Sequence, residues 1–279
     1  MSTNVSKNLF LRRSALGLFA IALLVLVTLP AHAGPVIDFV KNGSFETLAT
    51  GNTLVPAASG GAGGYFCQNS GNGTCISNVA NWGSTCQGTS CGTSGTPDAI
   101  LFGGTGGSAF NGFGLYTNGT TGLATNSPLP NSPSGGNFVA FDGDPAYNAT
   151  ISQTLTGLTP GATYVLSFYQ AAAQQQSNSG TTTEDWKVTF AGQSQTSTVM
   201  NNASKGWVAW NQVFMEFTAG STGTEVLSFL SQGTPAGQPP VVLLDGVSLT
   251  ASPEPQSLAL VGLGLVAIPL LAQRRKRRA

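Results

Sequence analysis

Short runs of alternating apolar and polar residues, separated by turn signals, constrain residues 34–252 most strongly. In the run 185–190, for example, Trp186, Val188 and Phe190 alternate with polar residues. A period of two predicts a strand with one buried face, and the abundance of Gly, Ser, Thr and Asn argues against long helices. The runs are 137–141, 149–155, 164–169, 185–190, 211–217, 225–230 and 241–249.

A first strand is expected within VIDFVKNGSFE at 36–46, which brings the number of strands to about eight. Thr159, Pro160 and Gly161 form a turn signal between two of the runs. Eight antiparallel strands in two packed sheets make a jelly roll. The fold class we predict is therefore all-β, a jelly-roll β-sandwich of about eight antiparallel strands.

The N-terminal end has the three parts of a secretory signal. Residues 1–13 carry three positive charges, residues 14–29 are almost wholly apolar, and Ala31-His32-Ala33 offers small residues for cleavage. This pattern predicts a signal peptide over 1–33 with a helical apolar part, and an uncleaved membrane helix is the alternative.

The C-terminal end, 253–279, also has three parts: Pro253-Glu254-Pro255, the apolar run SLALVGLGLVAIPLLA, and the basic cluster RRKRR. Sixteen helical residues reach roughly 24 Å, a little short of a bilayer core. The basic cluster would hold the tail's end in the cytoplasm and leave the body outside. We therefore predict that this run forms a short hydrophobic helix that contacts the membrane until the tail is cleaved.

This tail resembles the PEP-CTERM sorting signal of Gram-negative bacteria. The resemblance implies recognition and processing by an exosortase, a membrane protease, in hosts that usually make exopolysaccharide. It also implies a route from transient membrane anchoring to the cell surface or extracellular matrix. An ordinary C-terminal membrane anchor is the alternative, and both interpretations place the body outside the cytoplasm.

The body between these ends is acidic, although the formal charge of the whole chain is zero. Residues 34–252 contain ten acidic residues but only Lys41, Lys187 and Lys205, which gives a net charge near −7. Binding to nucleic acid needs a basic face that neutralises phosphates. The charge therefore argues against a nucleic-acid partner.

Residues 51–135 are Gly/Ser/Thr/Asn-rich and low in apolar periodicity. We interpret them as a loop-rich insertion in the sandwich, with short strands around Trp82 and Leu115-Tyr116. All four cysteines lie in it: Cys67, Cys75, Cys86 and Cys91.

An even number of cysteines in an exported chain favours two disulfides. Of the three possible pairings we expect the nearest neighbours, Cys67 with Cys75 and Cys86 with Cys91, because this pairing joins local loops that lack a core. A zinc site is the alternative, but the spacings of 8, 11 and 5 residues lack the CxxC pair that is typical of zinc sites.

The chain is not expected to be an enzyme. Its only histidine, His32, leaves with the signal peptide, which excludes Ser-His-Asp and Cys-His catalysis in the body. Carboxylate pairs are the remaining route to glycan cleavage, and the available clusters are Asp142 with Asp144 and Glu184 with Asp185. Adjacent strand residues point to opposite faces, and FDGDP is typical of a turn that bonds its own backbone.

NGSFE at 42–46 and LLDGVSL at 243–249 resemble the first and last strands of carbohydrate-binding jelly rolls of the galactose-binding-like superfamily. The resemblance implies that the two terminal strands lie side by side, with a structural calcium where they meet. Glu46 and Asp245 would be its carboxylate ligands, and hard oxygen ligands suit calcium. The alternative is that Asp245 caps a turn with Gly246 while Glu46 is solvated.

A sugar site would use aromatic rings together with polar side chains. Trp207 and Trp210, in GWVAWN before a strand, and Tyr147 are the candidate ligand-binding residues. For the two tryptophans the alternative is packing in the core or at the strand end. Trp186 is expected in the core because it shares the phase of buried residues.

Three functions remain open. The first is an exported, exosortase-sorted, noncatalytic surface or matrix protein that binds or associates with exopolysaccharide. The second is a carboxylate-dependent glycan hydrolase or lyase that joins Asp142, Asp144 or Glu184 in a cleft. The third is a structural surface protein that associates with itself.

Overall fold

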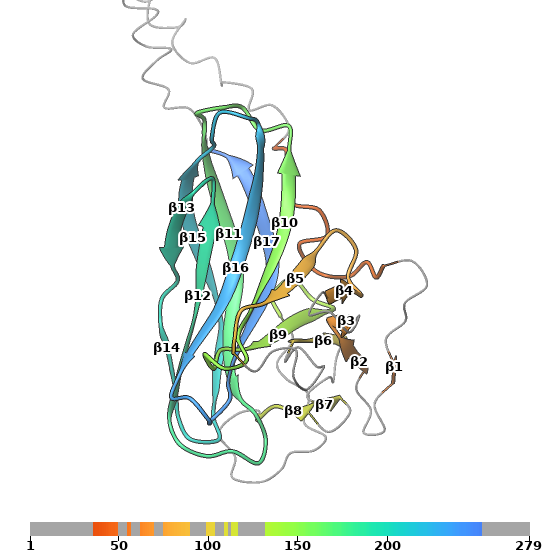
Figure 1. Cartoon of the computed structure of the whole chain (residues 1–279), viewed down its shortest axis with the longest axis vertical. Coiled ribbons are helices and arrows are strands. Elements are labelled where there is room, and N and C mark those ends of the chain that lie inside the picture. The colour runs from red at the N-terminus through yellow and green to blue at the C-terminus, as the bar shows by residue number, and fades with distance from the viewer. Residues whose placement is uncertain are drawn as a thin grey trace, which may run out of the picture. The chain divides into compact units, whose positions relative to one another are not determined.

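The computed structural model is all-β (Figure 1). The residues that it describes are 36–49, 55–56, 62–69, 75–89, 99–103, 109–110, 113–116 and 132–252. The long strands, all beyond residue 137, are β9 (Phe138–Asp142), β10 (Ala149–Thr156), β11 (Thr163–Gln174), β12 (Thr182–Phe190), β13 (Gln193–Thr196), β14 (Met200–Asn202), β15 (Trp207–Thr218), β16 (Thr224–Thr234) and β17 (Pro240–Ala251). The shorter strands are β1 (Val55–Pro56), β2 (Ala62–Tyr65), β3 (Cys67–Asn69), β4 (Cys75–Ser77), β5 (Gly83–Cys86), β6 (Ala99–Gly103), β7 (Ala109–Phe110) and β8 (Phe113–Gly114).

Two antiparallel sheets form the sandwich. The seven-stranded sheet has the order β1-β2-β6-β9-β17-β11-β15, and the six-stranded sheet has the order β13-β12-β16-β10-β5, with β14 paired to β12. This arrangement confirms an all-β antiparallel sandwich and is consistent with a jelly roll. Of the strands before residue 132, β1, β2 and β6 extend the seven-stranded sheet, β5 extends the six-stranded sheet, and β3–β4 and β7–β8 form two separate two-stranded sheets. The described strands therefore outnumber the predicted eight.

The main core lies between the two sheets, where the buried phases of their strands meet. Trp186 is fully buried and contacts Phe141 of the other sheet at a ring-centroid distance of 5.8 Å. Phe168 and Phe229, one from each sheet, meet edge to face at 5.1 Å. These contacts confirm the core position that the alternation predicts for Trp186.

Seven of the predicted runs form strands, namely β9, β10, β11, β12, β15, β16 and β17. The prediction of a first strand at 36–46 is wrong, because only Asp38 forms an isolated bridge there, to Thr250. Asn42 and Phe45 have φ values of 55° and 59°, which end the extended backbone. The Asn42 side chain donates to the Thr47 carbonyl and accepts from the Thr47 N–H, which holds this turn.

A second, smaller apolar cluster covers part of the outer face of the seven-stranded sheet. Its buried members are Leu115, Phe138, Ala140, Ala171, Ala173, Val241 and Leu243. Their immediate neighbours Val139, Ala172 and Val242 belong to the main core. Because successive strand residues point to opposite faces, both faces of this part of the sheet are buried.

The predicted signal peptide and the predicted sorting tail lie outside the described residues. Within the described part of the chain, no helix has the length and apolar character needed to cross a membrane.

Candidate functional site

Strand β15 presents a strongly exposed aromatic residue on the outer face of the seven-stranded sheet. Val213, Met215 and Phe217 of this strand are buried in the main core. Phe214 lies in the opposite phase, which otherwise carries polar residues, and 64% of its surface is exposed. A large apolar ring is thus held in solvent by a strand whose other face is anchored.

Trp207 and Trp210 lie on the same outer face, at the start of β15. Their ring centroids are 6.2 Å apart and nearly perpendicular, and Trp210 also meets Phe138 edge to face at 5.6 Å. Both are half-buried against the second apolar cluster. The structure therefore brings the two predicted tryptophans together and holds each ring from one side.

Strand β11 continues this surface beside β15. Tyr169 is paired with Gln212 of β15 and with Asp245 of β17, and Ser167 is paired with Phe214. We define the β11–β15 strip as the outward-facing residues Ser167, Tyr169, Trp207, Trp210, Gln212 and Phe214. Aromatic rings interleaved with hydroxyl and amide groups are the components of a sugar-binding surface.

Tyr147, the third predicted aromatic, lies on a different element. It is 36% exposed in the turn between β9 and β10, where its N–H donates to the carbonyl of Asp144 at 2.8 Å. It is not part of the β11–β15 strip and stays a separate candidate.

Glu46 and Asp245 come from opposite ends of the body and lie close enough to interact electrically. Asp245 is fully buried, and burial raises its pKa to about 7, with a further increase from the charge of Glu46. Asp245 accepts hydrogen bonds from the Ser134 hydroxyl and from the Gly246 N–H, so it also caps its turn. Two acids are thus placed side by side without a basic partner in the described residues.

Glu46 packs on the backbone of the loop that covers Asp245. Its Oε1 accepts the Asn137 N–H at 2.6 Å, and a Cβ at Gly136 would lie 1.8 Å from the same oxygen. Only glycine fits at that close approach, where φ is +71°. The two carboxylates and the nearby serine hydroxyls offer hard oxygen atoms, the kind of ligand that calcium prefers. Among the described residues, no group of three or more acidic, histidine or cysteine side chains could hold a metal ion, so the calcium site stays a prediction.

The acidic cluster of FDGDP is a backbone-binding turn. Asp142 Oδ1 accepts the Asp144 N–H, and Asp144 Oδ1 accepts the Ala146 N–H. Asp144 Oδ2 accepts the Gly237 N–H from the β16–β17 connection. Both oxygens of Asp144 therefore accept hydrogen bonds from main-chain donors, as expected for a turn that bonds its own backbone.

Glu184 is the other candidate acid, and it is buried under a polar pocket. Burial raises its pKa to about 7, which outweighs the lowering effect of its hydrogen bonds with Thr182 and Asn202. Its Oε2 atom has no hydrogen-bond partner. Burial also raises the pKa of Asp185, whose side chain points to the opposite face of β12.

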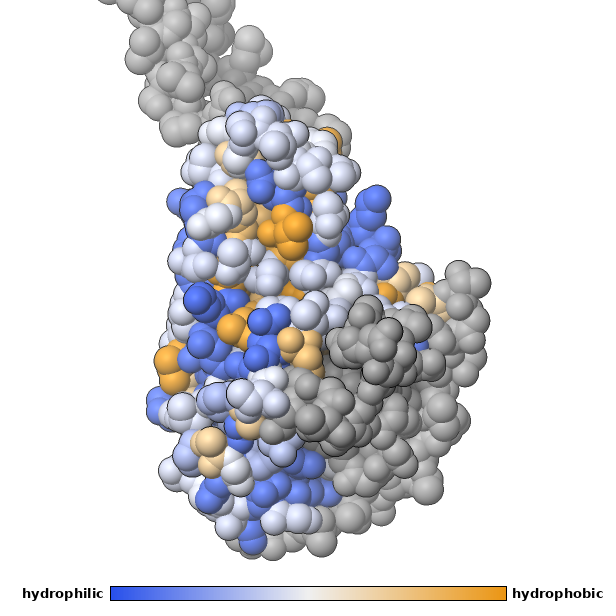
Figure 2. Space-filling model, viewed as in Figure 1, coloured by the Kyte–Doolittle hydropathy of each residue, from blue (hydrophilic) through white to orange (hydrophobic). Residues whose placement is uncertain are grey.

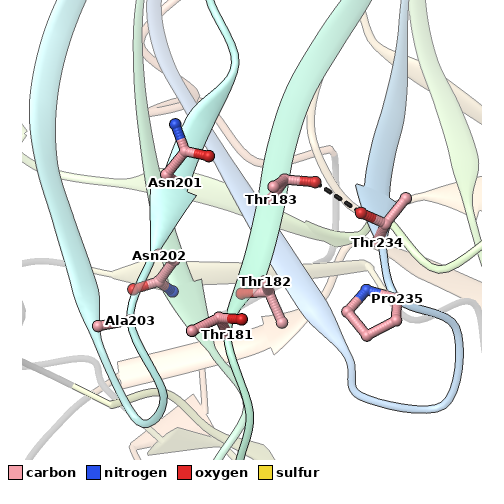
Figure 3. A pocket seen from close by; sticks show the side chains of 8 residues that line it. All are labelled: Thr181, Thr182, Thr183, Asn201, Asn202, Ala203, Thr234 and Pro235. Carbon is pink, nitrogen blue, oxygen red and sulfur yellow. Dashed lines mark hydrogen bonds between the residues drawn. The ribbon is translucent and has the colours of Figure 1, made fainter.

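The pocket beside Glu184 has a volume of about 590 Å³ and neutral walls (Figure 3). Its lining residues are Thr181, Thr182, Thr183, Asn201, Asn202, Ala203, Thr234 and Pro235. Thr183 and Thr234 share a hydrogen bond of 2.7 Å across it. Residues 203–206 connect this pocket to Trp207 at the start of the β11–β15 strip.

Cys86 takes part in a disulfide. The side chains of Cys67, Cys75 and Cys91 lie outside the described residues, so the nearest-neighbour pairing stays a prediction. The same holds for Pro253, Glu254 and Pro255 of the sorting motif.

Phe214 and Phe138 were not among the site residues expected from the sequence. Phe214 could have been found as an aromatic residue in the polar phase of NQVFMEF, between Gln212 and Glu216. Phe138 lies in the run FVAF, which does not alternate, and such a run indicates a strand buried on both faces.

No protein-family model matches the sequence, and the comparison with curated proteins also found no match. Among solved structures, the chain is similar to TmCBM61 in complex with β-1,4-galactotriose, at 15% identity over 77% of this chain and 99% of that one, with a TM-score of 0.40. It is similar to the enzymatically active domain of tailspike protein 4 of bacteriophage CBA120, at 12% identity over 77% of this chain and 22% of that one, with a TM-score of 0.36. A third is the CBM22-1 xylan-binding domain of Paenibacillus barcinonensis Xyn10C, at 14% identity over 50% and 80% of the two chains, with a TM-score of 0.26.

Proposed function

We propose that the body is a noncatalytic domain that binds polysaccharide outside the cell, through the β11–β15 strip. The observation that carries this proposal is Phe214, a ring that is 64% exposed on the same strip as the half-buried Trp207, Trp210 and Tyr169. Sugar rings present CH groups to aromatic faces and hydroxyls to polar side chains. Ser167 and Gln212 supply the polar partners within the same strip.

Side-chain hydrogen bonds support the backbone of β11 and β15 beneath the strip. Asn211 donates to the carbonyl of Gln170 at 3.4 Å, and Gln195 donates to the carbonyl of Glu216 at 2.6 Å. These bonds hold the strand and its neighbours before a ligand arrives. A preformed surface costs less ordering entropy on binding than a flexible one.

Affinity electrophoresis against a panel of neutral polysaccharides, including β-1,4-galactan and xylan, tests the proposal. We expect Phe214→Ala to weaken retention by at least one polysaccharide about ten-fold, the loss of one stacked ring. Val226→Ala is the matched control, because Val226 is 52% exposed but lies on β16 of the other sheet. Equal retention of the two variants, or no retention of the parent protein, would overturn the proposal.

Calcium at Glu46 and Asp245 is part of the proposal as a structural ion. It would join the turn at residues 42–47 to β17, and so hold the Ser132–Asn137 loop against the sheet. The support is the fully buried Asp245, which interacts with the exposed carboxylate of Glu46 and has the hydroxyl of Ser134 beside it. The ion would supply the positive charge that this pair lacks.

The location that we propose rests on the two ends of the sequence. The chain is exported, anchored for a time by its tail, and released to the surface or matrix after processing by an exosortase, where exopolysaccharide is the ligand. Mass spectrometry of the protein recovered from its host tests this. We expect a mature form that starts near Gly34 and ends near Pro253, and an intact tail would contradict sorting.

A further inference from the structure

A second polar pocket lies on the six-stranded sheet, where β5 pairs with β10. It has a volume of about 440 Å³, within the range of small-ligand sites. Its lining residues are Lys41, Asn81, Trp82, Gly83, Ser152, Gln153 and Thr154. None of these residues belongs to the β11–β15 strip.

The backbone at Lys41 is held in place by Gln153. Lys41 N–H donates to Gln153 Oε1 at 2.8 Å, and Gln153 Nε2 donates to the Lys41 carbonyl at 2.8 Å. On the next residue, the Asn42 carbonyl accepts the indole N–H of Trp82 at 2.9 Å. The main chain is thus positioned from two sides, while the Lys41 side chain remains exposed.

The edge of β10 beside this pocket is incompletely paired. Within the described chain, β5 pairs with β10 from Ala149 only as far as Ser152, opposite Gly83. Strand β10 itself continues to Thr156. Thr154 therefore lies on a part of the edge that β5 does not cover, and its side chain is exposed.

The charge of the pocket has the opposite sign to that of the body. Lys41 is one of three lysines in residues 34–252, against ten acids. No carboxylate lines the pocket, and none pairs with the Lys41 ammonium among the described residues. Asn81, Ser152 and Thr154 line the same pocket with neutral hydrogen-bonding groups.

We propose that this pocket, the Lys41 pocket, binds an acidic sugar, with the uronate carboxylate at the Lys41 ammonium and the sugar hydroxyls at Asn81, Ser152 and Thr154. The class of ligand, though not the site, rests on the proposed function. An anionic ligand is favoured because the ammonium is a charged donor that attracts a carboxylate, and charge-assisted hydrogen bonds are the strong ones. Hydroxyl and amide walls favour a sugar over a bare inorganic anion.

Titration of the isotope-labelled protein with methyl β-D-glucuronide, followed by amide NMR, tests the assignment. We expect saturable shifts at the Asn81 and Gly83 amides and at the Trp82 indole N–H. The uncharged methyl β-D-glucoside should bind about ten-fold more weakly, the loss of one charge-assisted hydrogen bond. Sodium acetate, which has the charge but no hydroxyls, should also bind more weakly.

Lys41→Gln should reduce glucuronide binding about ten-fold, and it leaves the bonds to Gln153 intact because they use the backbone of residue 41. Lys187→Gln is the matched control, since Lys187 is exposed on β12 and does not line the pocket. The proposal is overturned by absent glucuronide shifts, by equal affinity for the glucoside, or by an unchanged Lys41→Gln variant. These outcomes concern the Lys41 pocket alone. Failure of the proposed binding at the β11–β15 strip would appear separately, in the experiment with neutral polysaccharides and Phe214→Ala.

Discussion

The outer faces of the two sheets have opposite character. On the six-stranded sheet, β10 and β12 alternate strictly between buried and accessible residues, with Ser152, Thr154, Lys187 and Thr189 pointing outward. This sheet faces the viewer in Figure 1, and Figure 2 shows its hydrophobic residues as separate spots among hydrophilic ones. On the seven-stranded sheet, β9 is buried throughout, as are the first residues of β17.

Within the seven-stranded sheet, the outer face is covered in one part and open to solvent in another. The part of the seven-stranded sheet that carries the second apolar cluster has both faces buried and acts as a second core. The adjoining part, the β11–β15 strip, has an anchored inner face and an outer face that is partly open. Phe214, exposed on the same strip as Trp207 and Trp210, therefore belongs to a presented surface, whereas a single exposed aliphatic side chain such as Val226 on the other sheet is ordinary surface.

The largest expected effect distinguishes the second cluster from the six-stranded face. Phe138→Ala should lower the free energy of unfolding by about 3–5 kcal/mol, the usual loss for a buried phenylalanine. Val226→Ala, on the exposed face of β16, should change it by less than about 0.5 kcal/mol. Denaturant unfolding measures both, and a small effect at Phe138 would mean that the outer cluster is not a core.

The next effect concerns Glu184, whose folded-state pKa is raised from 4.5 to about 7. Its neutral form is favoured on folding, so stability is fully present below pH 4.5 and falls as the pH rises toward 7. The loss is about 3 kcal/mol for a shift of this size.

Glu184→Gln should remove that loss, since an amide stays neutral and its NH₂ replaces the unpartnered Oε2. The variant should be more stable than the parent at pH 8 and similar at pH 4, as unfolding curves at both values will show. The raised pKa of Asp245 causes a similar loss of stability as the pH rises, and this loss remains in the Glu184→Gln variant. Identical pH profiles of parent and variant would contradict the buried position of Glu184.

Calcium should produce a smaller, pH-dependent stabilisation. The ion competes with protons for Asp245, so it should raise the melting temperature more at pH 8 than at pH 5. At a concentration about 100 times the dissociation constant, the gain is about 2.7 kcal/mol. Asp245→Asn should abolish the response, whereas Glu225→Gln, on the six-stranded sheet, should retain it. A response that survives Asp245→Asn would place the ion elsewhere.

The smallest effect is expected for the stability of Phe214→Ala. Because the ring is mostly solvated, its removal should change the free energy of unfolding by less than about 0.5 kcal/mol. Thermal melting of this variant beside Phe138→Ala makes the comparison direct. A loss near that of Phe138 would show that Phe214 belongs to a covered surface.

Period-two alternation was sufficient to predict the strands that form the main core. It placed Tyr164, Leu166 and Phe168 on the buried face of β11. The predicted turn at Thr159 is present and is closed by a hydrogen bond from the Ala162 N–H to the Thr159 carbonyl at 3.2 Å. The alternation failed at residues 36–46, where positive φ at Asn42 and Phe45 depends on distant partners such as the Ala80 carbonyl.

The candidate site was predictable only in part. Trp207 and Trp210 were recognisable as a pair, but their half-buried state depends on Leu115 and Phe138, which lie far away in the sequence. Phe214 occupied a polar phase and was overlooked. The Lys41 pocket could not be predicted at all, because Gln153 holds Lys41 across 112 residues of sequence.

Amide NMR of the protein titrated with a neutral oligosaccharide that binds to it would test the polysaccharide-binding strip most directly. We predict that the shifts gather at Trp210, Gln212 and Phe214 on β15 and at Ser167 and Tyr169 on β11, while Asp185, Lys187 and Thr189 on β12 stay unchanged. Shifts confined to β12 or β16, or shifts spread evenly over both sheets, would contradict the assignment of the site to the seven-stranded sheet.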